Sequence, residues 1–359
     1  MGNGYTGASM TLDPIALTRR LVDVESITYN EGAVGTFLAE FLGGRGWAVE
    51  TMPVAQPKES GADAGSRSQR RNVYAHAPGE MPEVVFSTHT DTVPPFIPSS
   101  EDEEFIYGRG SCDAKGIIAA QIAAAERLRG EGVKAGLLFV VGEERDSAGA
   151  KAANEYAKEH AAQSRFLING EPTDNRVAVA SKGALRAVVR TTGKMAHSAY
   201  PELGESATHK MVEALGRILE IPLPVTEDVG PSTLNIGTIH GGHAPNVIAD
   251  AAEAQVLVRL VGDSAKTRQA IEAAVAGLGT VDFTLEIPFQ RLKAVEGLPT
   301  MVAAFTTDVP WLGNWGEPVL LGPGSIRAAH TAHEKLAKKE LLEAVELYVE
   351  VGKRLAGTR

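Results

Sequence analysis

The chain has 359 residues, with 35 Lys and Arg against 45 Asp and Glu, so its formal net charge is −10. This length fits two domains or one elaborate domain, and the negative charge argues against binding nucleic acid through a broad basic surface. The single cysteine, Cys112, excludes an intramolecular disulfide and any cysteine-based zinc or iron–sulfur site. Any metal must therefore be held mainly by His and carboxylate side chains. The sequence has neither a run of about 18 apolar residues nor a signal peptide, so we expect a cytoplasmic protein without membrane contact.

Strands and helices alternate through the first half of the chain. Apolar residues three and four apart predict two helices within residues 13–43. We then predict strands at 47–54, 72–76, 83–89, 136–141 and 165–169, with helices at 114–128 and 148–160. This order predicts an α/β domain with a mixed, mainly parallel sheet that is covered by helices on both faces.

The pattern changes after residue 180. We predict strands at 185–191, 232–239, 247–260 and 281–288 and helices at 206–220 and 265–278, in the order β-α-β-β-α-β. That order is ferredoxin-like, and it predicts a second, α+β domain inserted at residues 183–293. A strand at 318–321 and a closing helix at 335–355 return the chain to the first domain, which then spans residues 11–182 and 294–359.

Polar side chains follow the predicted strands of the first domain, where sites form in α/β sheets. The residues placed in this way are His89 and Asp91, Asp113, Glu143 and Glu144, Glu171, and His330. Imidazole and carboxylate ligands suit divalent zinc, cobalt or manganese. Two such ions a few Å apart need a carboxylate between them, and Asp113 is the natural bridge. His89 with Glu171 would complete one ion, and Glu144 with His330 the other.

Two of these carboxylates have predicted roles beside the metals. Asp91 lies two residues after His89, on the same face of a strand, so it is predicted to accept the second ring N–H of His89. Glu143 and Glu144 point in opposite directions if the strand continues that far, so that one ligates and the other faces the substrate. A carboxylate beside a metal-activated water is the expected general base.

The motifs together resemble the M20 metallopeptidases and deacylases, which include acetylornithine deacetylase, succinyl-diaminopimelate desuccinylase, aminoacylase-1 and glutamate carboxypeptidase. The matching stretches are STHTDTVP at 87–94, YGRGSCDAKG at 107–116, GEE at 142–144, GEPT at 170–173, GKMAHS at 193–198 and the segment around His330. The resemblance covers about residues 15–355. It implies a zinc-peptidase-like catalytic domain with two metal ions, expected to be zinc with cobalt or manganese as alternatives. It also implies that the inserted domain is a dimerisation or lid domain, and hence a homodimer.

The resemblance also assigns residues. It implies that His89 and Glu171 hold one zinc, that Glu144 and His330 hold the other, that Asp113 bridges them, and that Glu143 is the base with Asp91 as the partner of His89. For the substrate it implies that His197, from the partner subunit, stabilises the oxyanion and that Arg259 holds the substrate carboxylate. Asn246 and the backbone loop with Gly324 and Ser325 are expected near the substrate.

One position departs from the family pattern. Relatives often have an acidic residue or Asn three residues after the histidine ligand, where this chain has His333. It stays open whether His330 or His333 ligates, and we favour His330 because Glu334 then falls in register.

The expected activity is hydrolysis of the amide bond of an N-acyl-L-amino acid, as in acetylornithine deacetylase. Glu171, in place of Asp, resembles the deacylase and carboxypeptidase branch. The first alternative is a dipeptidase or carboxypeptidase that uses the same site on a short peptide. The second is a non-catalytic binding protein on the same fold.

Overall fold

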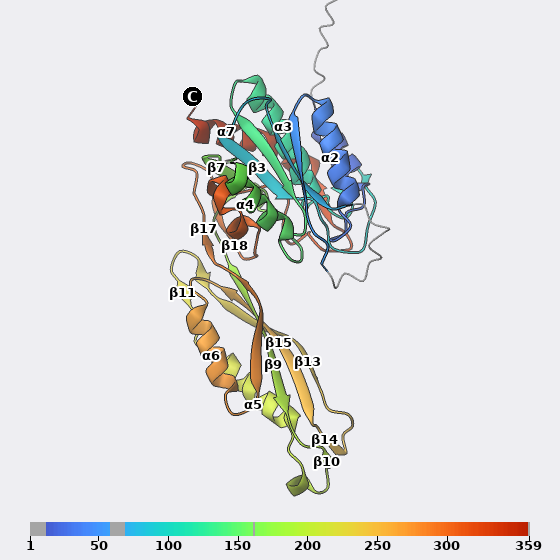
Figure 1. Cartoon of the computed structure of the whole chain (residues 1–359), viewed down its shortest axis with the longest axis vertical. Coiled ribbons are helices and arrows are strands. Elements are labelled where there is room, and N and C mark those ends of the chain that lie inside the picture. The colour runs from blue at the N-terminus through green and yellow to red at the C-terminus, as the bar shows by residue number, and fades with distance from the viewer. Residues whose placement is uncertain (1–11, 58–68, 161, 358–359) are drawn as a thin grey trace, which may run out of the picture. The chain divides into compact units, whose positions relative to one another are not determined.

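The computed structural model describes residues 12–57, 69–160 and 162–357. The expected start of the first domain, residue 11, lies outside them. The chain separates into two compact units (Figure 1). The first contains residues up to Val179, Leu292–Met301 and Thr307–Arg359, and the second contains Ala180–Arg291 and Val302–Thr306. The sequence did not indicate that 302–306 belongs with the second unit, because this short stretch has no pattern of its own.

A mixed sheet organises the first unit. Its strands lie in the order β1 (Ala48–Pro53), β2 (Arg71–His76), β6 (Ala135–Val140), β3 (Val84–His89), β7 (Phe166–Asn169), β19 (Glu317–Leu320), β8 (Val177–Ser181) and β17 (Gln290–Arg291), and β18 (Thr300–Ala303) also pairs with β8. The four central strands from β6 to β19 are parallel to one another. The flanking pairs β1–β2, β2–β6, β19–β8 and β8–β17 are antiparallel. The predicted mixed α/β sheet is confirmed, with the parallel pairing at its centre.

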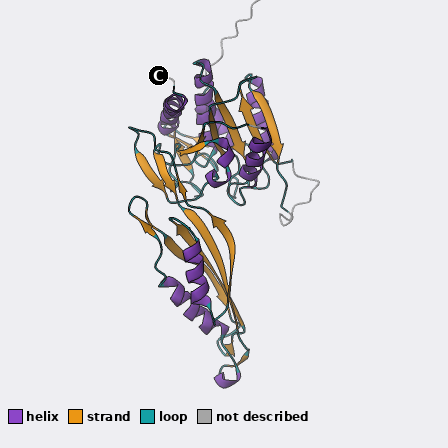
Figure 2. Ribbon diagram, turned by 60° about the vertical axis from the view of Figure 1, so that its left-hand side comes forward, coloured by secondary structure: helices purple, strands orange, loops and turns teal. Residues whose placement is uncertain are grey.

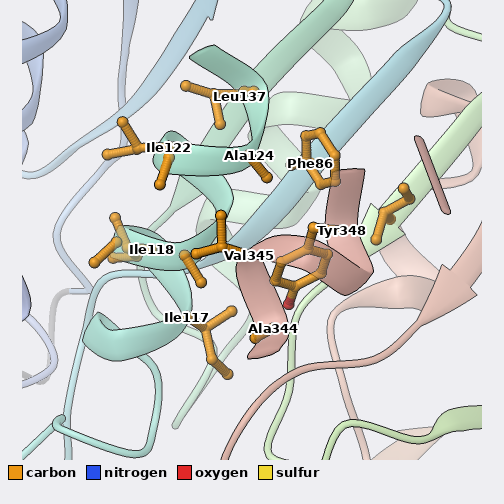
Figure 3. Packing of buried hydrophobic residues seen from close by; sticks show 14 of the residues in the cluster. Phe86, Ile117, Ile118, Ile122, Ala124, Leu137, Ala344, Val345 and Tyr348 are labelled. Carbon is orange, nitrogen blue, oxygen red and sulfur yellow. The ribbon is translucent and has the colours of Figure 1, made fainter. Parts of the chain in front are cut away.

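Helices cover both faces of this sheet because its central strands are apolar on both sides. Phe86 of β3 belongs to a buried cluster that includes residues of helices α1 (Pro14–Val22), α2 (Gly32–Gly44), α3 (Lys115–Gly130) and α7 (Lys338–Ala356). The ring of Phe86 meets the edge of Tyr348 with centroids 5.5 Å apart, and Figure 3 shows the Ile-rich face of α3 beside them. Val85 points the other way, into the cluster with α4 (Ala148–His160). The core therefore lies in two layers that hold the strand ends rigidly.

Two predicted elements differ from the structure. The helix predicted at 335–355 begins only at Lys338, because Lys335–Ala337 forms strand β20, in which buried Leu336 pairs with Ile106 of β5 (Phe105–Tyr107). These strands form a small sheet with β4 (Ser100–Glu101). The strand predicted at 247–260 is interrupted, because the carbonyls of Ala249 and Asp250 accept hydrogen bonds from other segments. It becomes β14 (Val247–Ile248) and β15 (Ala251–Leu260).

The second unit is a four-stranded antiparallel sheet with two helices on one face (Figure 2). Its strands lie in the order β13 (Thr233–Gly241), β15, β9 (Gly183–Thr192) and β16 (Thr280–Ile287). Helices α5 (Ala207–Leu219) and α6 (Ala265–Val275) pack on the side where alternate residues of β15, such as Val256 and Val258, are buried. The other face carries Gln255 and Arg259. This strand order confirms the ferredoxin-like prediction.

Short strands and turns complete the described chain. In the second unit β10 (Ala196–His197) pairs with β14, and β11 (Val225–Thr226) pairs with β12 (Gly230–Pro231). The 3-10 turns are η1 (Pro201–Leu203), η2 (Val309–Trp311) and η3 (Gly313–Trp315). Among the described residues, no helix combines the length and the apolar character that crossing a bilayer requires.

Candidate metal centre

The candidate ligands gather where the parallel strands end. His89 is the last residue of β3, the strand between β6 and β7, and Glu144 and Glu171 follow those two neighbours. Parallel strands place their carboxyl ends at one edge of a sheet, so three segments far apart in sequence meet there. Asp113 comes from the turn that precedes α3, and His330 from the loop after β19.

The first cluster is formed by His89, Asp113 and Glu171, all of which are buried, with one donor atom from each within 4.8 Å of the others. Nε2 of His89 lies 2.9 Å from Oδ1 of Asp113. Burial raises the pKa of the Glu171 carboxyl well above its usual range; His89 opposes this rise and Asp113 adds to it. A divalent cation among these atoms would offset the repulsion between the two carboxylates.

The second cluster is formed by Asp113, Glu144 and His330, again with donor atoms within 4.8 Å of one another. Nε2 of His330 lies 2.9 Å from Oε1 of Glu144 and 3.3 Å from Oδ2 of Asp113. The side chain of His330 is 48 % exposed, whereas those of Glu144 and Asp113 are 7 % and 6 % exposed. Asp113 therefore belongs to both clusters and offers one oxygen to each histidine.

His333 belongs to neither cluster. Its side chain is exposed, and neither group of candidate ligands among the described residues includes it. The loop geometry supports His330 as the ligand, since His330 adopts φ 63° and faces the two carboxylates.

The donor set suits two divalent ions of the zinc class. Each cluster combines one imidazole nitrogen with two carboxylates, the mixture that zinc, cobalt and manganese bind. The shared aspartate is the anionic group that two adjacent cations need. Hydrogen bonds from both histidines lower the pKa of Asp113 even though burial raises it, so its carboxylate is held ionised between the clusters.

Two oxygens of Asp91 face Nδ1 of His89. The backbone carbonyl lies 2.9 Å away and the carboxylate Oδ1 lies 3.5 Å away, so the carbonyl makes the shorter contact. The carboxylate accepts the backbone N–H groups of Gly142, Glu143 and Glu144 at 2.9, 3.1 and 3.2 Å. The role of Asp91 as the partner of His89 stays a prediction, and the three N–H contacts give the same buried carboxylate a second role.

Glu143 and Glu144 are not on a strand. β6 ends at Val140. A turn follows, in which Gly142 has φ 83° and its carbonyl accepts a hydrogen bond from the N–H of Ser147 at 2.7 Å. The predicted alternation therefore does not apply, but the two side chains still separate. Glu144 enters the second cluster, while Glu143 belongs to neither. Burial raises the pKa of Glu143 well above its usual range, and the nearby Glu171 carboxylate raises it further.

Sequence reasoning did not single out Asp308, which precedes η2. Asp308 is 1 % exposed, so its carboxylate is buried. Burial raises the pKa of Asp308 to about 7. Its negative charge in turn raises the pKa of Glu143 and of Glu171. The sequence carries no signal for it, since it lies in a loop outside the matched motifs. Glu334, also buried, was marked only by its spacing from His330.

The remaining candidates lie in both units. Gly324, in the first, has φ 86° and donates its N–H to Glu340 at 2.8 Å, and the carbonyl of the next residue, Ser325, accepts the thiol of Cys112 at 3.5 Å. His197, in the second, is exposed on β10 and pairs with Val247, next to Asn246.

Arg259 also lies in the second unit. It lines a pocket of about 340 Å³ on the helix-free face of the sheet, together with Arg186. Its Nη1 donates to Oγ1 of Thr306 at 3.4 Å.

Comparison with known proteins identifies the family. Residues 179–279 match the family described as a peptidase dimerisation domain. The chain is 37 % identical over 345 residues to a peptidase M20 domain-containing protein of Schizosaccharomyces pombe, covering 93 % of this chain and 82 % of that one. It is also 37 % identical over 372 residues to a probable carboxypeptidase of Aspergillus fumigatus, covering 93 % and 84 %. The chain belongs to the M20 peptidase family.

Solved structures share the fold. A tripeptidase from Staphylococcus aureus superposes with a TM-score of 0.78 at 21 % identity, covering 97 % of this chain and 100 % of that one. A dinuclear metal binding peptidase of the M20 family from Bacillus subtilis superposes with a TM-score of 0.65 at 16 % identity, covering 96 % and 98 %. With the family established by the sequence relatives, the protein is a hydrolase that acts on amide or peptide bonds.

Proposed function

We propose that this chain hydrolyses the amide bond of a small substrate with two divalent metal ions, which we expect to be zinc. The observation that carries the proposal is the position of Asp113, whose Oδ1 and Oδ2 face His89 and His330 at 2.9 and 3.3 Å. Asp113 would bridge the ions, with Glu171 completing the first site and Glu144 the second. When bound, the ions would lower the pKa of the attacking water and polarise the amide carbonyl.

Glu143 is the proposed general base. It lies beside the clusters without belonging to either, and the raised pKa given above suits a group that takes up and releases a proton. Glu143 accepts a proton from the attacking water and donates it to the nitrogen of the leaving amine. The C–N bond breaks, and the products are a carboxylate and an amine.

Asp91 fixes the backbone of this base. Its three N–H contacts hold residues 142–144, and Thr28 donates its hydroxyl to the same carboxylate at 2.9 Å. This support keeps Glu143 and Glu144 in place while their charges change.

The substrate is proposed to carry a free carboxylate, with Arg259 as its partner and Asn246, Gly324 and Ser325 as further contacts. Arg259 and Arg186 line one pocket, which favours an anion. The match to a peptidase dimerisation domain supports a homodimer, in which the partner subunit's His197 donates a hydrogen bond to the developing oxyanion.

Two substrate classes fit this chemistry. The carboxypeptidase name of a 37 % identical relative favours cleavage of a short peptide next to its C-terminal residue. Glu171 and the stretch GEPTDNRVAVASKGALR favour an N-acyl-L-amino acid as in acetylornithine deacetylase. Both leave an amino acid with a free carboxylate, and they differ only on the acyl side.

We further propose that the protein acts in the cytoplasm.

A matched substrate panel tests the proposal. Metal-free protein is reloaded with Zn²⁺ or Co²⁺ and assayed on N-acetylornithine, N-acetylarginine, the dipeptides that end in the same residues, and their C-terminal amides. We expect hydrolysis of one free-carboxylate series and little of the amides. Hydrolysis of the amides at an equal rate would contradict the carboxylate requirement. No hydrolysis of the panel with either metal would overturn the proposed activity toward these substrate classes.

A further inference from the structure

The turn that carries Asp113 has a fixed shape. Residues 108–114 connect β5 to α3, and Gly108 and Gly110 have φ values of 130° and 89°. A Cβ at Gly110 would lie 2.9 Å from side-chain atoms of Lys115 and of Thr92. Positive φ and the lack of space together require glycine there. The N–H groups of residues 110, 112 and 113 consequently point toward one place.

The carboxylate of Glu334 fills that place. Its Oε1 accepts the N–H groups of Gly110, Cys112 and Asp113 at 2.9, 3.2 and 3.1 Å. Its Oε2 accepts Nη1 of Arg109 at 2.6 Å, and the two side chains are only 0 % and 2 % exposed. Converging backbone N–H groups form a concave anion-binding site. This chain fills that site with its own carboxylate, and Arg109 offsets the buried charge.

Glu334 also fixes the segment that carries His330. Its backbone carbonyl accepts the N–H of Gly108 at 3.1 Å. The next residue, Lys335, begins β20 and pairs with Tyr107 of β5. His330 lies four residues before Glu334, so a single buried residue connects the turn of the shared aspartate to the loop of the second histidine. Among the described residues, Glu334 belongs to neither group of candidate ligands.

We propose that Glu334 is a positioning residue that sets Asp113 opposite His330 and thereby determines the affinity of the second metal site. It acts through the backbone of residues 110–113 and makes no contact with substrate in this scheme. The inference rests on the proposed function, because it presupposes that Asp113 and His330 hold metal.

The test uses Glu334→Gln, which keeps the shape of the side chain. The amide oxygen can still accept N–H groups of the turn, but the amide N–H₂ then faces the Nη1 donor of Arg109 with no acceptor between them, and the negative charge is lost. We expect roughly 10–100-fold weaker binding of one of two Zn²⁺ equivalents. Titration of metal-free protein with Zn²⁺ against a chromophoric chelator measures this affinity, and Co²⁺ absorption reports the geometry of the site. Thermal unfolding is recorded in parallel.

Glu126→Gln is the matched control. Glu126 is 13 % exposed and pairs with Arg45, another arginine, but it lies toward the far end of α3 from Asp113. A purely structural role for Glu334 predicts lower stability with unchanged zinc affinity, as we expect for this control. Arg109→Met is a second variant that leaves the three backbone contacts of Glu334 in place, and we expect a smaller loss of affinity from it.

The outcomes separate the two proposals. Wild-type Zn²⁺ affinity at both sites of folded Glu334→Gln would overturn the positioning role and leave the proposed function standing. Failure of the wild-type chain to bind two Zn²⁺ would instead overturn the proposed metal centre. If near-UV circular dichroism shows that Glu334→Gln is unfolded, Arg109→Met decides: a selective loss at one site supports the role, and unchanged affinity rejects it.

Discussion

The backbone N–H of Glu143 donates a hydrogen bond to Oδ1 of Asp91 at 3.1 Å. The carboxylate next to the first histidine of the site thus holds the loop of the proposed base, and the histidine ring bonds to the backbone carbonyl of Asp91. Asp91 is fully buried, so each of its hydrogen bonds is protected from competing water. The carboxylate of Asp91 thus connects the segment of His89 to the loop of Glu143.

Removal of the Thr28 hydroxyl tests this link without changing a proposed catalytic residue. Thr28→Val deletes the 2.9 Å hydrogen bond to Oδ2 of Asp91, and hydrogen bonds to charged groups contribute about 1.5–3 kcal/mol. We expect the free energy of unfolding to fall by about that amount, and kcat to fall up to roughly tenfold as the loop of Glu143 loosens. Thr36→Val, which loses a bond to a helix carbonyl, is the control. Equal kcat values in the two variants would argue against the link.

Replacement of Glu143 by Gln removes the proposed base and keeps its volume. We expect kcat to fall by about 10²–10⁴, the usual contribution of a positioned proton-transfer group. Zinc content should stay at the wild-type level, since Glu143 belongs to neither cluster. Steady-state kinetics and elemental analysis check both expectations, with exposed Glu155→Gln on α4 as the control. Activity within a few-fold of wild type would mean that another group takes the proton.

The two neighbouring histidines give a matched pair for the metal centre. His330→Ala removes the imidazole that faces Asp113 and Glu144, and we expect retention of about one zinc per chain. His333→Ala, at an exposed position in neither cluster, should retain both ions. Asp113→Ala should lower the affinity of both sites. Elemental analysis after dialysis decides, and the opposite result for the two histidines would make His333 the ligand.

The pH dependence of metal-free stability follows from the buried carboxyls. Glu143 and Glu171 have folded-state pKa values well above 4.5, so the folded chain keeps protons that the unfolded chain releases, and stability falls as pH rises above about 4.5. His330, with its pKa raised from 6.5 to about 10, stabilises fully below 6.5 and loses this contribution as pH rises toward 10. Burial lowers the pKa of Lys115 from 10.5 to about 7, so this group makes stability rise with pH above about 7.

Thermal unfolding in chelator between pH 5 and 8 measures this dependence. We expect Tm to decrease with rising pH, because the lowered lysine pKa acts only in the upper part of that range. Saturating zinc should remove the decrease, since metals bind the deprotonated carboxylates and the neutral imidazoles. A metal-free Tm that rises steadily across this range would be inconsistent with the raised carboxyl pKa values.

Local patterns were sufficient for most of the elements. The strand β3 and the Ala- and Ile-rich helix α3 are predicted from their apolar runs alone. Most residues of both elements are buried, as such runs indicate. The start of α7 was misplaced because Leu336 is apolar in either element, and only its pairing with Ile106 selects a strand. The roles of Asp91 and Glu334 were missed or incomplete for a similar reason: a carboxylate can accept many hydrogen bonds, and its partners lie 51 or more residues away.

The sequence by itself determined which chemistry is available. One cysteine left only imidazole and carboxylate ligands, and the order of the motifs placed them after successive strands. The tertiary structure alone decided how those groups meet. It brought both oxygens of Asp113 between His89 and His330, and it assigned Asp91 and Glu334 to backbone N–H groups in turns. Residue types and spacing record the identity of a side chain, but the direction of a buried carboxylate is set by the donors that surround it after folding.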